Sequence, residues 1–213
     1  MAETRIILVR HGETEWNREG RIQGYHADSR LTAAGEEQAR RLAARLGREP
    51  LRALHSSDSG RARQTATPVA TALKLDVAYD AALRERSYGV FEGRTYEELE
   101  REHPDAYRKF RSRDPGYAPP GGESGEQFRE RIVAALERIA TAGAEHAAVI
   151  THGGVLGVMH RHITRTSPQT KREYALLNAS INRIVYSTGR WSIEAWGDVA
   201  HLAAGSGDSI EGA

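Results

Sequence analysis

The chain has 213 residues, of which 39% are hydrophobic and 28% charged, with a formal net charge of +1 and no cysteine. This composition supports one packed globular domain rather than a disordered chain. The lack of cysteine excludes disulfides, thiolate metal sites and a cysteine nucleophile. The balanced charge gives no global field, so we expect no nucleic-acid or membrane partner, and anion binding must come from local arginines.

The N-terminal residues show no basic region followed by a long apolar stretch. No apolar run approaches the roughly 18 residues that a membrane-spanning helix needs. We therefore expect a cytoplasmic protein.

The first element is a short β-branched run, Thr4–Val9, which predicts a buried strand. This strand stops abruptly at Arg10, His11 and Gly12. The polar residues 12–30, which include three glycines and Asn17, predict an ordered loop.

A helix is predicted next, with Thr32 as its N-cap and Gly47 as its C-cap. A later helix is expected with Ser57 or Asp58 as its N-cap, and Pro68 either kinks it or begins a new one. Two further strands are predicted, over residues 51–55 and 75–79.

Residues 86–122 differ in character, being polar and charged with four of the seven prolines. They predict an insertion with one or two helices, and its length makes it a candidate lid over a site. Its basic run, residues 108–113, is either a solvated face or part of a substrate-binding surface.

Ser124 and Gln127 match a capping box that opens an amphipathic helix. Residues 147–150 predict another buried strand, which ends in Thr151, His152 and Gly153. A helix follows to about residue 163. Residues 181–196 alternate in polarity and turn at Thr188-Gly189, which predicts a hairpin at the sheet edge.

Strands that alternate with helices indicate an α/β sandwich. We expect one domain over residues 1–203, with the lid at about 86–122 and a flexible tail at 204–213. Two central strands each end in a His followed by Gly, at the edge where such sheets bind ligands.

The residue types that gather in this pattern suit phosphoryl transfer. A neutral imidazole can attack a phosphate dianion without the repulsion an anionic nucleophile meets. Guanidinium groups grip the phosphate oxygens, and a carboxylic acid protonates the leaving alkoxide. Nearby cations should keep the imidazole neutral.

These requirements assign roles to particular residues. His11 is the nucleophile and Glu85 the proton donor. Arg10 and Arg61 hold phosphate oxygens, and His152 donates a further hydrogen bond. Asn17 supplies an amide proton, and Gly12 and Gly153 let the backbone approach the anion.

Four motifs, LVRHGETEWN, SSDSGRARQT, LRERSYGVFEG and ITHGG, resemble in order and rough spacing those of the histidine phosphatase superfamily, also called phosphoglycerate-mutase-like. The resemblance places His11 at the family's phosphorylated position, Arg61 at its phosphate-binding Arg, Glu85 at its acid/base and His152 as the second pocket His. It implies a metal-independent mechanism and a three-layer α/β/α sandwich, in which helices flank a mixed, mostly parallel sheet.

The superfamily contains phosphatases and mutases, which share this pocket. The moderate insertion, the tail and the FEG sequence resemble the phosphatase branch, whose bacterial members are often named probable phosphoglycerate mutases. Arg86 and Tyr88 resemble substrate-contacting positions of mutases, and we assign them, with Gly24, to substrate binding. We expect a phosphatase without a cofactor; a mutase would need 2,3-bisphosphoglycerate.

The expected partner is a small phosphorylated metabolite, and a homodimer is an open possibility. His160 and His162 lie two apart on a predicted helix and so face different directions, which argues against a shared metal, and we assign no metal ligand. A non-catalytic phospho-ligand binding module is the least favoured reading, because no core catalytic group is missing.

Overall fold

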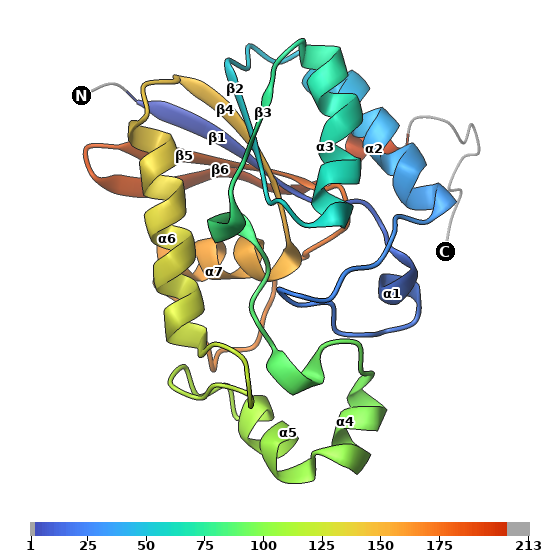
Figure 1. Cartoon of the computed structure of the whole chain (residues 1–213). Helices are drawn as coiled ribbons and strands as arrows, with labels where there is room; N and C mark the ends of the chain where they lie inside the picture. Colours follow the sequence, from blue (N-terminus) through green and yellow to red (C-terminus); the bar gives the residue numbers. More distant parts are fainter. Residues whose placement is uncertain (1–2, 204–213) are drawn as a thin grey trace, which may run out of the picture.

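The computed structural model describes residues 3–203 (Figure 1). The tail predicted over residues 204–213 lies outside the described residues. Within residues 3–203, no helix combines the length and the apolar character needed to cross a membrane.

One sheet of six strands forms the centre, in the order β3-β2-β4-β1-β5-β6. The strands are β1 (Thr4–Arg10), β2 (Ala53–Ser56), β3 (Val77–Tyr79), β4 (His146–Thr151), β5 (Ile181–Ser187) and β6 (Arg190–Asp198). Strands β3, β2, β4 and β1 pair in parallel, while β5 and β6 form a hairpin that adds to β1 in antiparallel. The predicted mixed, mostly parallel sheet is confirmed.

Helices cover both faces of the sheet (Figure 1). On one face lie α2 (Ala33–Leu46) and α3 (Gly60–Leu73), and on the other α6 (Gly125–Thr141) and α7 (Gly153–Thr164). Because side chains alternate along a strand, β1 serves both cores: Ile6 and Leu8 pack with α6 and α7, Ile7 and Val9 with α2 and α3. Because helices cover both faces of the sheet, β1 is buried on both sides, which explains its continuous apolar sequence.

The helix ends follow local rules with one exception. Thr32 caps α2, Gly47 ends it, and Ser124 forms the predicted capping box at α6. The start predicted for the next helix is wrong, because α3 is capped at Ser59. The Ser57 N–H still bonds to the carbonyl of Ile150 (2.9 Å), so the chain is extended there.

Pro68 lies inside α3 and begins no new helix. Its fixed φ suits a helix, but the helix loses one backbone donor there and the proline ring crowds the carbonyl four residues earlier. The predicted loop 12–30 contains one unforeseen turn of helix, α1 (Glu15–Arg18), which Thr14 caps.

The hairpin turn lies at Thr188 and Gly189, which both have positive φ, 49° and 77°. These values fit a tight two-residue turn and leave β6 at the sheet edge, as predicted.

Residues 86–122, the predicted lid, form a small unit beyond the carboxyl ends of the parallel strands (Figure 1). It contains η2 (Gly89–Phe91), α4 (Tyr96–Glu102) and α5 (Pro104–Arg111) around a core of its own that includes Phe91 and Leu99. Two short elements complete the chain, η1 (Ala81–Leu83) before the lid and α8 (Ala200–Ala203) at the end.

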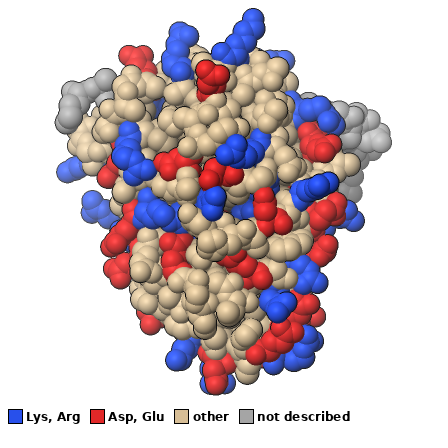
Figure 2. Space-filling model, viewed as in Figure 1, with Lys and Arg blue, Asp and Glu red and all other residues tan. Residues whose placement is uncertain are grey.

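The face of the molecule in Figure 2 carries Lys and Arg interspersed with Asp and Glu. No single-sign field covers this face, in keeping with the net charge of +1.

Candidate active site

Two neighbouring parallel strands bring the two predicted histidines together. Arg10 at the end of β1 pairs in register with Thr151 at the end of β4. The next residues are therefore His11 and His152, whose ring centroids lie 5.4 Å apart. Both side chains are buried, 3% and 0% exposed.

His11 is oriented by its own backbone neighbour. Its Nδ1 lies 2.7 Å from the carbonyl oxygen of Gly12, which can only accept, so Nδ1 carries the proton and Nε2 keeps a lone pair. Burial lowers the pKa of His11 well below its usual value, and the charges of Arg61 and Arg10 lower it further. The predicted effect of the cations is present, but burial is the larger cause.

Gly12 is required where the chain passes α2. A Cβ at this position would lie 2.6 Å from the carbonyl oxygen of Gly35. The glycine after His11 thus lets β1 and the start of α2 pack closely.

The Arg61 side chain is 1% exposed and reaches from α3 toward the loop that holds Gly24. Its Nη1 donates to the Ala27 carbonyl (3.1 Å) and Asp28 Oδ1 (2.9 Å), and its Nη2 to the Gly24 carbonyl (2.8 Å). Its Nε is buried with no partner among the described residues. Arg61 therefore holds the 24–28 loop, a task that the sequence analysis did not foresee.

Two further nitrogens at this edge are buried without partners among residues 3–203: Arg10 Nε and His152 Nδ1. Arg10 Nη1 donates to the Leu176 carbonyl, while Nε would lie 3.4 Å from a Cβ built on Gly153. His152 Nε2 lies 2.8 Å from Ser57 Oγ. Burial, and then the charge of Arg61, lowers the pKa of His152 well below its usual value.

The Glu85 carboxylate is fixed by two backbone donors. Oε1 accepts from the Arg86 N–H (2.8 Å) and Oε2 from the Gly154 N–H at the start of α7 (2.7 Å). Arg131 of α6 donates to the carbonyls of Arg84 (3.0 Å) and Glu85 (3.2 Å). Two backbone N–H groups thus hold the carboxylate, and Arg131 holds the main chain that carries it.

The orientation of the Asn17 amide is set by two donors to its oxygen. Oδ1 accepts from the Thr14 N–H (3.2 Å) and from Asn178 Nδ2 (3.1 Å). The amide nitrogen of Asn17 therefore points away from both groups, free to donate. Asn178 Nδ2 also lies 3.0 Å from the His11 carbonyl, so it ties Asn17 to the strand end.

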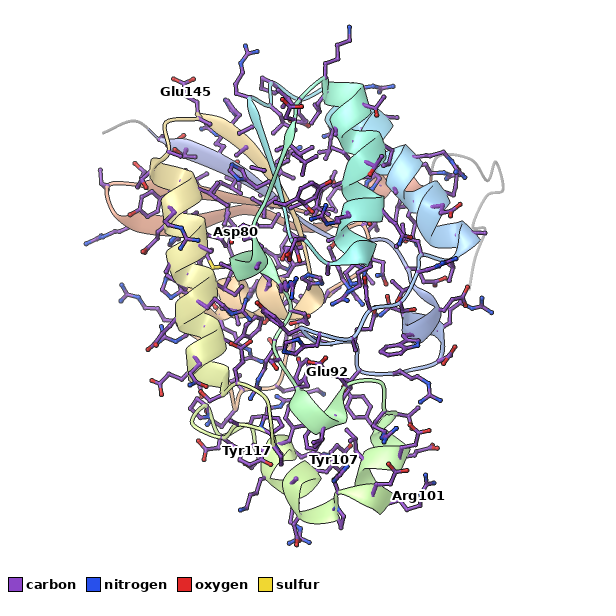
Figure 3. All side chains as sticks on the ribbon, viewed as in Figure 1. Asp80, Glu92, Arg101, Tyr107, Tyr117 and Glu145 are labelled. Atoms are coloured by element: carbon purple, nitrogen blue, oxygen red, sulfur yellow. The ribbon has the colours of Figure 1, made fainter. Side chains whose placement is uncertain are left out.

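Gly24 has a positive φ of 73°, and a Cβ there would lie 2.3 Å from Glu92 Oε1. Glu92 accepts from the N–H groups of Tyr25, His26 and Ala27, and from Tyr88 in the lid. Figure 3 shows Glu92 at the junction between the lid and the rest of the molecule. The carboxylate joins the 24–28 loop to the lid.

Arg86 and Tyr88 line a cavity of about 1240 Å³ between the lid, α7 and residues 166–176. Arg86 Nε and Nη2 donate to the carbonyls of Glu123 (3.0 Å) and Tyr117 (2.9 Å). Burial raises the pKa of Tyr88 far above its usual value, so its hydroxyl stays protonated. Neither His11 nor Arg61 lines this cavity. Arg86 and Tyr88, which were predicted to bind substrate, therefore face a space next to the strand ends and not the space around His11.

Four supporting residues were missed by the sequence analysis: Ser57, Glu92, Arg131 and Asn178. Ser57 and Glu92 stood inside the quoted motifs, and a polar residue there was the available signal. Arg131 and Asn178 carried none, because each reaches the site only after a helix or loop has packed against the strand ends.

Among residues 3–203, no three His, Cys, Asp or Glu side chains are grouped to hold a metal ion. The His160 ring of the H-x-H pair stacks on Tyr174, with centroids 3.6 Å apart.

Comparison with known proteins gives a consistent picture. The family model of the histidine phosphatase superfamily (branch 1) matches residues 6–199. A metal-independent phosphoserine phosphatase from Arabidopsis thaliana is 42% identical, over 94% of this chain and 84% of its own. Probable phosphoglycerate mutase GpmB from Escherichia coli is 37% identical, over 97% and 98%. Among solved structures, YhfR from Bacillus stearothermophilus superposes with a TM-score of 0.85 at 32% identity, covering 93% of this chain and 99% of that one.

Proposed function

The chain belongs to the histidine phosphatase superfamily, and on that premise we propose that it is a phosphatase that hydrolyses small phosphomonoesters through a phosphohistidine on His11. We further propose that the reaction needs neither a metal nor a cofactor. The substrate is a small phosphorylated metabolite.

One observation carries the proposal. Three buried nitrogens without partners among the described residues, Arg10 Nε, Arg61 Nε and His152 Nδ1, belong to the strand ends and helix that surround His11. Buried donors are nearly always satisfied, and cationic groups together call for an anion. A phosphate group beside Nε2 of His11 would satisfy all three if His152 carries its proton on Nδ1 and accepts from Ser57 at Nε2.

In the first half of the reaction, the His11 Nε2 lone pair attacks phosphorus. The bond between phosphorus and the ester oxygen breaks, and Glu85, protonated when substrate is bound, gives its proton to that oxygen. Arg10 and Arg61 stabilise the charge on the non-bridging oxygens, with help from His152 and Asn17. The alcohol leaves, and phosphohistidine remains.

In the second half, the Glu85 carboxylate takes a proton from water as the water oxygen attacks phosphorus. The phosphorus–nitrogen bond breaks, its electron pair returns to His11 Nε2, and inorganic phosphate leaves. Glu85 is then protonated for the next turnover. The cavity that begins at Gly154, whose N–H holds Glu85, leaves room for the alcohol to depart and water to enter.

The second candidate is a phosphoglycerate mutase dependent on 2,3-bisphosphoglycerate, which the name of the Escherichia coli relative favours. A mutase must keep water from phosphohistidine until a substrate takes the phosphoryl group back. The size of the cavity beside Glu85 supports the phosphatase instead.

The test uses purified protein in EDTA with 3-phosphoglycerate, with and without 2,3-bisphosphoglycerate, alongside a panel of phosphomonoesters. Free phosphate and 2-phosphoglycerate are scored separately. We expect phosphate from several esters and negligible 2-phosphoglycerate. Rapid isomerisation that depends on the bisphosphate would make the protein a mutase.

The control is His11→Ala, which removes the nucleophile and should abolish turnover and the acid-labile label left on the protein by [32P]phosphomonoester. Its circular dichroism should match that of wild type. Turnover retained in this variant would overturn the phosphohistidine mechanism.

A further inference from the structure

The cavity beside Glu85 is much larger than a three-carbon substrate requires. Its volume is about 1240 Å³, whereas pockets for drug-sized ligands measure about 300–1,000 Å³. Because Gly154 both lines the cavity and holds the Glu85 carboxylate, the cavity lies on the side from which the leaving group is protonated. Its occupant is therefore the alcohol part of the ester.

One wall of the cavity is aromatic. Tyr88 and Phe110 meet edge to face with centroids 5.8 Å apart, and Tyr96 and Tyr107 line the same space. Figure 3 shows Tyr107 and Tyr117 among the side chains of the lid. Aromatic faces and edges of this kind pack best against a flat ring.

The other feature of the cavity is its charge. Seven of its lining side chains are Lys or Arg and two are Asp or Glu. The imbalance is local, since the whole chain has a net charge of only +1. The cavity therefore favours an occupant that is itself negatively charged.

Most of these cations already have a structural task. Arg86 donates to the carbonyls of Tyr117 and Glu123, as described above. Arg161 donates to the carbonyls of Ser167 and Thr170, and Arg113 also donates to Thr170. Arg111 lies over the Tyr107 ring, 5.9 Å from its centroid.

Arg172 and its neighbour Lys171 differ from these. Within residues 3–203 neither makes a hydrogen bond or ion pair, and both line the cavity from the segment between α7 and β5. Of the two, Arg172 carries the planar guanidinium that can hold a carboxylate with two hydrogen bonds. Burial lowers the pKa of Arg10, the charge of Glu85 opposes this, and Arg61 and Arg172 lower it further. Burial raises the pKa of Tyr96, and Arg172 opposes this rise, so the charge of Arg172 acts on both the phosphate-binding edge and the aromatic wall.

We propose, resting on the phosphatase function above, that this cavity is the leaving-group subsite for a phosphomonoester whose alcohol carries a flat ring and a second anionic group, and that Arg172 pairs with that anion. The lid contributes the ring-binding wall and the segment of Arg172 the charge. Arg172 determines specificity and takes no part in bond breaking.

The test uses two matched esters, 4-carboxybenzyl phosphate and its neutral amide, 4-carbamoylbenzyl phosphate. The methylene group keeps the leaving alcohols almost equally reactive, so the ratio of their kcat/KM values reports recognition of the second charge. We expect Arg172→Gln to lower that ratio about fivefold, through KM for the carboxylate, while kcat/KM for the amide stays the same. The unchanged amide turnover shows that the variant is folded.

The matched control is Arg165→Gln, which removes an exposed arginine of the same connecting segment that does not line the cavity. It should keep the wild-type ratio. An unchanged ratio in Arg172→Gln, or an equal fall in both variants, would overturn the role of Arg172.

3-Phosphonooxypropanoate tests the ring, because it has a carboxylate and an alkyl leaving group but neither a ring nor an ammonium group. Wild type should turn over 4-carboxybenzyl phosphate with a kcat/KM about tenfold higher than that for 3-phosphonooxypropanoate. A preference for 3-phosphonooxypropanoate would overturn the subsite while leaving the phosphatase function in place. Release of phosphate from none of the three esters would overturn the phosphatase function itself.

Discussion

At the scale of single residues, the structure explains how the site keeps histidine neutral among cations. Burial and the nearby arginines both disfavour a charged ring at His11, and the Gly12 carbonyl selects the tautomer with Nε2 free. The Glu85 carboxylate is also held in one position, because each of its oxygens accepts a hydrogen bond from a backbone N–H. The chemistry proposed for both residues depends on which atom carries the proton.

Glu85→Gln tests the proton donor. An amide cannot supply the proton, so kcat/KM for benzyl phosphate, whose leaving alkoxide is strongly basic, should fall about 100-fold or more. For p-nitrophenyl phosphate, whose leaving group needs little protonation, the fall should be much smaller. Steady-state kinetics on the two esters measure the difference, and equal losses would argue against an acid role.

At the scale of elements, the site is assembled where a strand end meets a helix start. The first turn of α7 supplies the Gly154 N–H that holds Glu85, and the same helix lines the leaving-group cavity. A Cβ on Gly154 would lie 2.0 Å from Glu85 Oε1, so this position must be glycine for the carboxylate to stay where it is.

Gly154→Ala should displace the Glu85 carboxylate and reproduce the selectivity of Glu85→Gln, with at least a tenfold fall in kcat/KM for benzyl phosphate and a smaller one for p-nitrophenyl phosphate. Gly157→Ala on the same helix is the control. Its Cβ would make only ordinary contacts, the nearest at 3.7 Å.

Gly157 also lines the cavity, so its control readout is the ratio of the two esters. Gly157→Ala should keep the wild-type ratio of kcat/KM for benzyl phosphate to that for p-nitrophenyl phosphate, and it should raise the free energy of unfolding by up to about 1 kcal/mol, because alanine favours a helix. An equal ratio in the two alanine variants would show that the Gly154 contact does not position Glu85.

At the scale of the whole molecule, the buried histidines link stability to pH. Burial lowers the pKa of His11 and His152 in the folded state, so as pH falls below about 6.5 the unfolded chain takes up their protons first. Stability is therefore fully present above that pH and lost below it. Four other histidines have pKa values lowered by burial and act in the same direction: His55, His160, His162 and His201.

Urea unfolding at pH 7.5, 6.5 and 5.5 should show stability falling between the last two values. Each neutral buried histidine adds about 1.4 kcal/mol per pH unit to the slope. His11→Asn removes one such group, so its slope should be smaller by about that amount. An identical slope in the variant would mean that His11 is protonated in the folded protein.

The sequence by itself determined the elements and the residue types of the site. The apolar run of β1, the Thr32 cap and the Ser124 capping box are local signals, because each depends on neighbours within a few positions. The alternation of strands with helices predicted an α/β sandwich, and the family resemblance predicted the mixed sheet. The His-Gly pairs at two strand ends placed His11 and His152 at the edge where such sheets bind ligands, and the structure shows that the two strands are neighbours.

Only the tertiary structure decided which contacts position the site residues and which cavity lies next to them. Arg61 bonds to a loop 37 positions away, at Gly24, and Asn178 reaches the His11 carbonyl from 167 positions away. The N-cap of α3 moved to Ser59 because Ser57 is bound to a distant strand and to His152. Contacts between residues far apart in the chain depend on how the layers pack, so no local sequence pattern predicts them. The leaving-group cavity likewise forms only when the lid, α7 and the segment of Arg172 pack together.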